Sequence, residues 1–129
     1  MSKKFERVYS GAPWEQKVGY CRAIAAGDLI FVTGTAPVTD DGGVFAPGDA
    51  TAQAARCLEL IERALEQFGV DRTTIVRTRM FVTDIARWQE FGDAHAAFFA
   101  EHHPATTMVE VSRLIADDML IEIEADAVR

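Results

Sequence analysis

A stripe of apolar residues at helical spacing, between residues 51 and 68, constrains the fold of this chain more than any other feature. Charged residues occupy the opposite face, so the segment is predicted to be an amphipathic helix that buries one side. Asp49 or Thr51 can cap its start, and Gly69 can end it. The stripe consists of Ala54, Cys57, Leu58, Ile61, Leu65 and Phe68, and the charged face of Arg56, Glu59, Glu62, Arg63 and Glu66.

Segments of β character flank this helix on both sides. Residues 19–35 form two apolar runs that break at Ala26-Gly27-Asp28, as in a hairpin. Residues 105–114 and 119–128, joined by Ala116-Asp117-Asp118, are predicted to be a second strand pair. The sequence does not decide whether residues 5–9 form a further short strand at the start of the chain. Residues 75–83 alternate, with Val76, Thr78, Met80 and Val82 expected on one face and Arg77, Arg79 and Phe81 on the other.

A second helix is predicted after Asp84, which can cap it, and before Pro104, which prevents its continuation. Its stripe is Trp88, Phe91, His95 and Phe98. Helices separated by strands, with a hairpin at each end, favour an α+β fold in which both helices cover one face of a mixed sheet. The uncovered face is expected to be buried by oligomerisation, because four apolar residues cannot all point at two helices: Ile30, Val32, Met108 and Val109.

Length and charge limit the classes of protein to which this chain can belong. Its 129 residues, 49% of them hydrophobic, suffice for one domain, residues 1–129, with a packed core. A net charge of −7 without a basic stripe argues against nucleic acid as a partner. Phe5-Glu6-Arg7 follows Lys3 and Lys4 in place of an apolar run, so we expect no signal peptide; nor is any stretch long enough for a membrane span. Cys21 and Cys57 are interpreted as core residues of a cytoplasmic protein.

The last apolar run carries Glu122, Glu124 and Asp126 on one face, about 7 Å apart. A solvated sheet face is one interpretation of this row. The other requires an oligomer that encloses the face, since burial then raises the pKa of a carboxylate and lets it activate a water molecule. The sequence alone leaves both interpretations open.

Arginines and histidines give no specific motif. Arg22, Arg77, Arg79 and Arg113, the last placed in the fifth strand, are interpreted as partners in salt bridges, with anion binding as the alternative. His95 is expected to be half-buried, and the three histidines do not form a metal set. Nucleotide-binding and common hydrolase motifs do not occur, so no cofactor and no metal are expected.

Six motifs follow one another along nearly the whole chain, from about Tyr9 to Arg129: VGYCRAI, DLIFVTGTAPV, QAARCLELIERALEQFGV, VRTRMFVTDI, PATTMVEVSRL and IEIEADAV. In their order and content they resemble the motifs of the RidA family, also called YjgF or L-PSP. The resemblance implies a chorismate-mutase-like α+β fold, a homotrimer whose sheets close into a central barrel, and three clefts at subunit interfaces. It also implies hydrolysis of reactive enamines and imines, such as 2-aminoacrylate, to a keto acid and ammonia.

The resemblance assigns some residues to a cleft and leaves others in doubt. Tyr20 matches the family's cleft tyrosine, Thr33-Gly34 its Ser-Gly, and Glu122 its water-orienting glutamate. Thr106 stands where the family has its substrate-binding arginine, and Gly92 where helix two has an asparagine. A threonine hydroxyl cannot replace the two parallel hydrogen bonds of a guanidinium. Arg22, which replaces a usual glutamine, is the candidate substitute for that arginine.

Three hypotheses about function remain open at this point. The first is a homotrimer that binds a small carbonyl, imine or carboxylate metabolite, with deaminase-type hydrolysis of that metabolite left open and without the archetypal activity on 2-aminoacrylate. The second is a non-catalytic binding or sensing module. The third, the endoribonuclease or translation-inhibitor role attached to some relatives, is the weakest because the chain is acidic.

Overall fold

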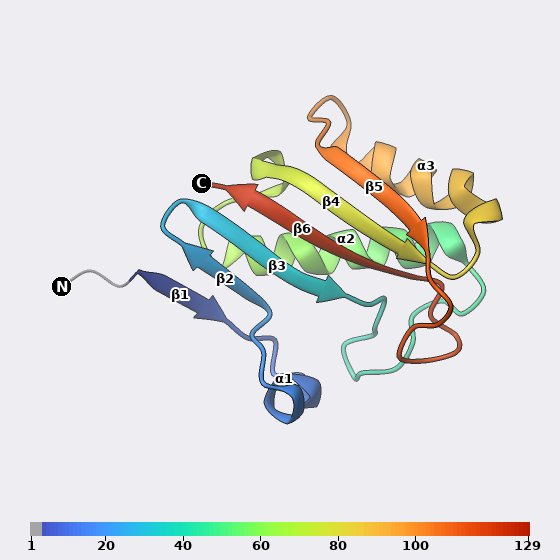
Figure 1. Cartoon of the computed structure of the whole chain (residues 1–129), viewed down its shortest axis with the longest axis horizontal. Helices are drawn as coiled ribbons and strands as arrows, with labels where there is room; N and C mark the ends of the chain where they lie inside the picture. The colour runs from blue at the N-terminus through green and yellow to red at the C-terminus, as the bar shows by residue number, and fades with distance from the viewer. Residues whose placement is uncertain (1–3) are drawn as a thin grey trace.

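The computed structural model describes residues 4–129; Lys3, which entered the expectation about a signal peptide, lies outside the described residues. Six strands form one mixed sheet in the order β1-β2-β3-β6-β4-β5, and α2 and α3 lie together behind it (Figure 1). The α+β architecture with both long helices on one face is therefore confirmed. The strands are β1 (Phe5–Val8), β2 (Ala23–Ala26), β3 (Leu29–Thr35), β4 (Ile75–Val82), β5 (Ala105–Glu110) and β6 (Ile121–Val128).

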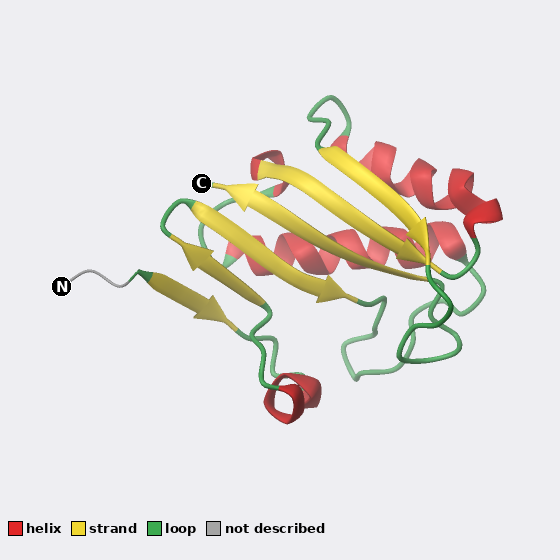
Figure 2. Cartoon of the chain, in the orientation of Figure 1, coloured by secondary structure: helices red, strands yellow, loops and turns green. Residues whose placement is uncertain are grey.

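The main helix, α2 (Ala50–Glu66), forms where the apolar stripe predicts it. Asp49 caps its start by accepting a hydrogen bond from the Ala52 amide at 3.0 Å. Its buried side packs on β3 and β6 and against α3 (Trp88–Phe99), so the core lies between the two helices and the sheet (Figure 2). Two short 3-10 turns, η1 (Arg72–Thr74) and η2 (Ile85–Arg87), precede β4 and α3.

The predicted pairing of the two C-terminal strands is wrong. β6 lies between β3 and β4 and is antiparallel to both, whereas β5 pairs with β4 in parallel at the sheet edge. A parallel neighbour needs a crossover, and α3 supplies it between β4 and β5. Arg113 accordingly lies in the loop between β5 and β6, not in a strand.

The face pattern predicted for β4 is only partly right. The register between β4 and β6 shifts between Ile75 and Arg77, which buries Ile75 and leaves Val76 about half exposed (49%). Ile30 and Val32 are buried and Met108 packs against the core, whereas Val109 is exposed. Of the four residues named for this argument, Val109 thus lies on the uncovered sheet face, where Phe31 and Phe81 accompany it.

A short helix that the periodicity analysis missed, α1 (Pro13–Val18), connects β1 to β2. Proline at its first position and Gly19 in the left-handed conformation after it (φ 87°) are the sequence signals that favour it. Glu15 is buried within this helix and accepts hydrogen bonds from the Ser10 amide and hydroxyl and from the Gly11 amide. The carboxylate thereby holds the chain entry to α1 in place.

Candidate functional site

Glu122 occupies the middle of the sheet, on β6, opposite Phe81 of β4 and on the face that the helices leave uncovered. Its half-buried carboxylate lies directly against the backbone of Gly34, where a β-carbon would collide with Oε2. The register between β3 and β6 shifts between Val32 and Thr35, which brings this glycine beneath the carboxylate. A side chain at position 34 would therefore meet the free end of the Glu122 side chain and push the carboxylate out of this position.

The surroundings of Glu122 set its proton affinity. Burial raises the pKa of the Glu122 carboxyl above its ordinary value, the positive charge of Arg22 lowers it, and the neighbouring Glu124 raises it. A carboxylate with a raised pKa is a better proton acceptor than an exposed one, because the bound proton is held more tightly. This is the electrostatic setting expected of a group that handles a water molecule.

Arg22 links the remaining predicted residues on this side. Its Nη2 donates to the Gly34 carbonyl at 3.0 Å, and its guanidinium carbon lies 5.6 Å from the centre of the Tyr20 ring. The Thr33 amide donates to the Arg22 carbonyl at 3.0 Å, and the Thr33 hydroxyl donates to the Cys21 carbonyl at 2.7 Å. Five predicted site residues are thus brought together: Tyr20, Arg22, Thr33, Gly34 and Glu122.

Thr106 does not join this cluster within one chain. On β5 it is the register partner of Thr78, and the two hydroxyls are 2.7 Å apart. Thr78 points to the helix side, whereas Phe81, the partner of Glu122, lies three residues further along β4 and so on the other face. Thr106 and Glu122 therefore project from opposite faces of one sheet, and a site that uses both must draw them from two chains.

The other two carboxylates of the β6 row have a different role. Arg79 Nη1 lies 3.4 Å from Glu124 Oε1 and 3.3 Å from Asp126 Oδ2. The salt-bridge interpretation of Arg79 is thereby confirmed, and Glu122 is distinguished by its contact with Gly34 and its proximity to Arg22. Arg113 forms a 3.6 Å ion pair with Asp117 on the surface.

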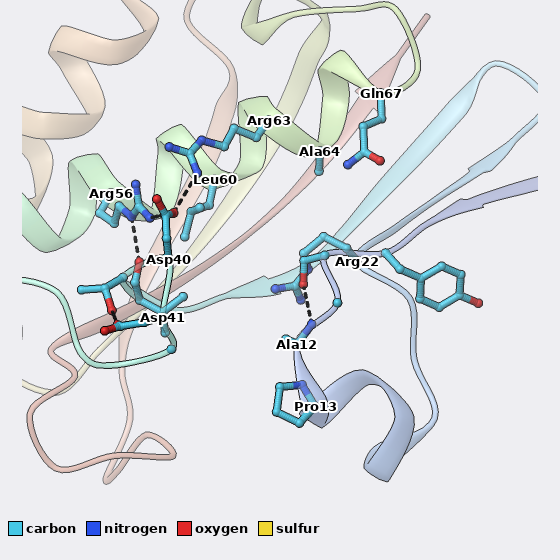
Figure 3. Close-up of a pocket in the computed structure, with 16 residues that line it drawn as sticks. Ala12, Pro13, Arg22, Asp40, Asp41, Arg56, Leu60, Arg63, Ala64 and Gln67 are labelled. Carbon is cyan, nitrogen blue, oxygen red and sulfur yellow. Dashed lines mark hydrogen bonds and ion pairs between the residues drawn. The ribbon is translucent and has the colours of Figure 1, made fainter.

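A cleft of about 490 Å³, which sequence reasoning missed, opens on another side of Arg22. Figure 3 shows Arg22, Ala12 and Pro13 along one wall and Asp40, Arg56 and Arg63 along the other. Arg56 and Arg63 both pair with Asp40, at 2.9 and 3.2 Å. Among residues 4–129, the Arg22 Nε is the buried side-chain nitrogen that has no hydrogen-bond partner. Arg22 lines this cleft, whereas Glu122 does not.

The described residues show neither a metal-binding cluster nor a membrane-spanning helix. Within residues 4–129, no three histidine, cysteine, aspartate or glutamate side chains are grouped closely enough to hold a metal ion. In the same part of the chain, no helix combines the length and the apolar character that crossing a membrane requires.

Comparison with known proteins shows what the chain is similar to. The family model described as Endoribonuclease L-PSP matches residues 12–129. The 2-iminobutanoate/2-iminopropanoate deaminase of Escherichia coli K12 is 37% identical over 113 residues, which cover 85% of this chain and 87% of that protein. A Mycobacterium tuberculosis structure described as a member of the YjgF/YER057c/UK114 family is 45% identical, covers 97% and 99% of the two chains, and has a TM-score of 0.87. Escherichia coli TdcF, solved with bound serine, is 28% identical, with 99% of both chains covered and a TM-score of 0.81.

Proposed function

The chain belongs to the Endoribonuclease L-PSP family, the RidA family that its motifs indicate, and on that premise we propose that it hydrolyses imines. In this proposal the protein is a homotrimer that binds a small carbonyl, imine or carboxylate metabolite in clefts at the subunit interfaces. The observation that carries this proposal is the Glu122 carboxylate, half-buried against Gly34 and near Arg22, with a raised pKa. It is supported by the deaminase name of the Escherichia coli relative.

In the proposed reaction, Glu122 accepts a proton from a water molecule as that water attacks the imine carbon. The carbon–oxygen bond forms as the carbon–nitrogen double bond becomes single, and the nitrogen takes the first water proton from Glu122. The proton of the new hydroxyl then moves to the nitrogen, the carbon–nitrogen bond breaks, and the carbonyl product and ammonia leave. Backbone groups near Gly34 stabilise the polarity that develops at the reacting centre, and the hydroxyl of Thr106 holds the substrate.

The proposed subunit interface is supported by the uncovered sheet face. Phe31 and Val109 are each 43% exposed there, beside the charged row of β6. Apolar side chains gathered on one face favour a contact with another chain. Since Thr106 and Glu122 lie on opposite faces of one sheet, a cleft that contains both also requires a second chain.

The missing arginine limits which imines the proposed enzyme uses. A guanidinium holds a substrate carboxylate by two charge-assisted hydrogen bonds, and Thr106 cannot do so. Arg22 is the cation nearest to this role, but one of its donors already binds the Gly34 carbonyl. We therefore propose weak activity on 2-aminoacrylate.

A non-catalytic binding module is the second candidate, favoured by the 490 Å³ cleft that Arg22 lines away from Glu122. The endoribonuclease activity in the family's description is not proposed for this chain, because its net charge of −7 opposes binding to phosphates.

Hydrolysis of freshly generated imines, with and without a carboxylate, tests the proposal. We expect the wild-type protein to exceed the buffer rate and Glu122→Gln to lower its rate by about 100-fold or more, the size of a typical general-base contribution. Glu66→Gln, which removes an exposed carboxylate at the end of α2, is the matched control and should retain the wild-type rate. Rates equal to buffer for every imine would remove catalysis and leave binding as the remaining candidate.

A further inference from the structure

Three polar side chains form a continuous hydrogen-bonded chain from the sheet edge into the protein. The exposed residue Thr106 on β5 has its hydroxyl 2.7 Å from the hydroxyl of Thr78 on β4. That hydroxyl is in turn 2.8 Å from Nε2 of His95 on α3. Thr78 is fully buried and His95 is half-buried, so the chain connects a surface hydroxyl to an enclosed imidazole.

The direction of these hydrogen bonds is set by the imidazole. When Nε2 of His95 carries a hydrogen, it donates to Thr78, Thr78 donates to Thr106, and Thr106 presents its O–H outward. When Nε2 is unprotonated, every donor turns inward and Thr106 presents only oxygen lone pairs. Since a neutral histidine can adopt either tautomer, the surface hydroxyl can serve as a donor or an acceptor at one pH.

The environment of His95 favours the uncharged imidazole. Burial lowers the pKa of His95, and the nearby His103 lowers it further. The Phe99 ring, centred 4.5 Å away, covers it from one turn further along α3, and Thr78 faces it from β4. Among the titratable groups of residues 4–129, His103, in the loop before β5, is the one whose charge acts on the pKa of His95.

We propose that Thr106 contacts the ligand at its end of the site and that His95 positions the Thr106 hydroxyl through Thr78. These three hydrogen-bonded side chains select a ligand with an uncharged carbonyl or imine substituent in place of a carboxylate. A carboxylate placed there would lose water without gaining a cation, whereas an uncharged carbonyl needs only one donor. The inference rests on the proposed interface site, because it takes Thr106 as part of that site.

Pyruvate and pyruvamide are the matched probes, since they share a ketone and differ in the charge of the neighbouring group. Binding of each is measured by titration while the His95 ring nitrogens are followed by NMR. We expect pyruvamide to bind at least about 5-fold more tightly than pyruvate and to increase the Nε2-protonated form of His95, because its carbonyl accepts from Thr106.

Variants of single threonines separate a specific contact from general perturbation. Thr106→Val, which keeps the shape and removes the hydroxyl, should weaken pyruvamide binding about 5- to 10-fold and abolish the response of His95. Thr73→Val, at an exposed threonine of η1 whose hydroxyl bonds to Asp71, is the matched control and should change neither. Thr106→Ser should restore both, and Thr106→Arg should reverse the preference so that pyruvate binds more tightly.

The inference is overturned if pyruvate binds the wild type as tightly as pyruvamide, if Thr106→Val behaves like Thr73→Val, or if His95 does not respond to pyruvamide. Failure of the proposed hydrolysis is distinguishable from these results. If the protein hydrolyses no imine but binds pyruvamide through Thr106, the contact with Thr106 stands and the proposed reaction fails. If it hydrolyses imines but Thr106→Val binds pyruvamide as the wild type does, the reaction stands and the contact with Thr106 fails.

Discussion

At the scale of single residues, the proposed chemistry depends on how tightly Glu122 holds its proton. The carboxylate must be unprotonated to accept a proton from water, so the rate should be low below its raised pKa and rise as the pH passes through it. Glu124 contributes to this raised pKa, and Arg22 opposes it. The midpoint of the pH–rate profile therefore depends on the charges of both Glu124 and Arg22.

Two substitutions should move this midpoint in opposite directions. Glu124→Gln removes a negative charge, so the pKa of Glu122 should fall and the midpoint should shift to lower pH. Arg22→Gln removes a positive charge, so the midpoint should shift to higher pH. Each shift is measured from the rate of imine hydrolysis over the pH range in which the variant stays folded. Shifts in the same direction for both variants would contradict the assigned electrostatics.

Two glycines test the close packing of the site. Gly34→Ala places a β-carbon against the Glu122 carboxylate and should remove most of the activity. It should change the free energy of unfolding by less than about 1 kcal/mol, because the free end of this side chain can move aside. Gly92→Ala adds a β-carbon in open space within α3 and should stabilise the protein by about 0.5–1 kcal/mol. Rates of imine hydrolysis and chemical denaturation of both variants measure the contrast, and a Gly34→Ala variant with the wild-type rate would show that the position of Glu122 beside residue 34 does not matter to the reaction.

At the scale of the elements, the placement of Glu122 depends on a buried amide that connects α2 to the start of β6. The Gln53 side chain is fully buried; its Nε2 donates to the Asp118 carbonyl at 2.9 Å, and its Oε1 accepts from the Leu120 amide at 2.8 Å. This pair of bonds satisfies the backbone groups of the turn that leads into β6. The helix and the central strand are thus joined by one side chain.

Gln53→Leu should lower the free energy of unfolding by about 1–3 kcal/mol, because the Asp118 carbonyl and the Leu120 amide lose the partner that the buried Gln53 side chain supplies. Gln89→Leu, at an exposed position of α3, is the matched control and should change that free energy by less than about 0.5 kcal/mol. Urea denaturation followed by circular dichroism compares the two. A loss at position 53 no larger than that at position 89 would exclude Gln53 as the link.

Much of the element list follows from periodicity, whereas strand order does not. The stripe of α2 and the alternation of β6 each depend on neighbours within one segment, so the sequence predicts them. Which strand pairs with β5 depends on the α3 crossover, and the long loop from residue 111 to 120 carries no signal that separates β5 from β6. The family motifs gave Glu122, Gly34 and Tyr20. They did not give the face of Thr106, since this depends on its register with Thr78.

At the scale of the whole molecule, the proposed site requires more than one chain. The helices cover one face of the sheet, Phe31 and Val109 are exposed on the other, and Thr106 projects away from the face of Glu122. A ligand site with Glu122 from one chain and Thr106 from the next explains these three facts together. The central claim is therefore that the active unit is the interface between chains.

Mixed oligomers test this claim most directly. Glu122→Gln and a cleft-blocking Thr106→Trp should each be nearly inactive alone. When equal amounts of the two variants are unfolded together and refolded, about a quarter of the sites should be active. The reason is that a site works only if one chain supplies an intact Glu122 and its neighbour an intact Thr106. The measurement is the rate of imine hydrolysis per chain, beside the molecular mass in solution. A trimer that regains about this fraction is the expected result. A monomer, or a mixture no more active than its two parents, would contradict the account.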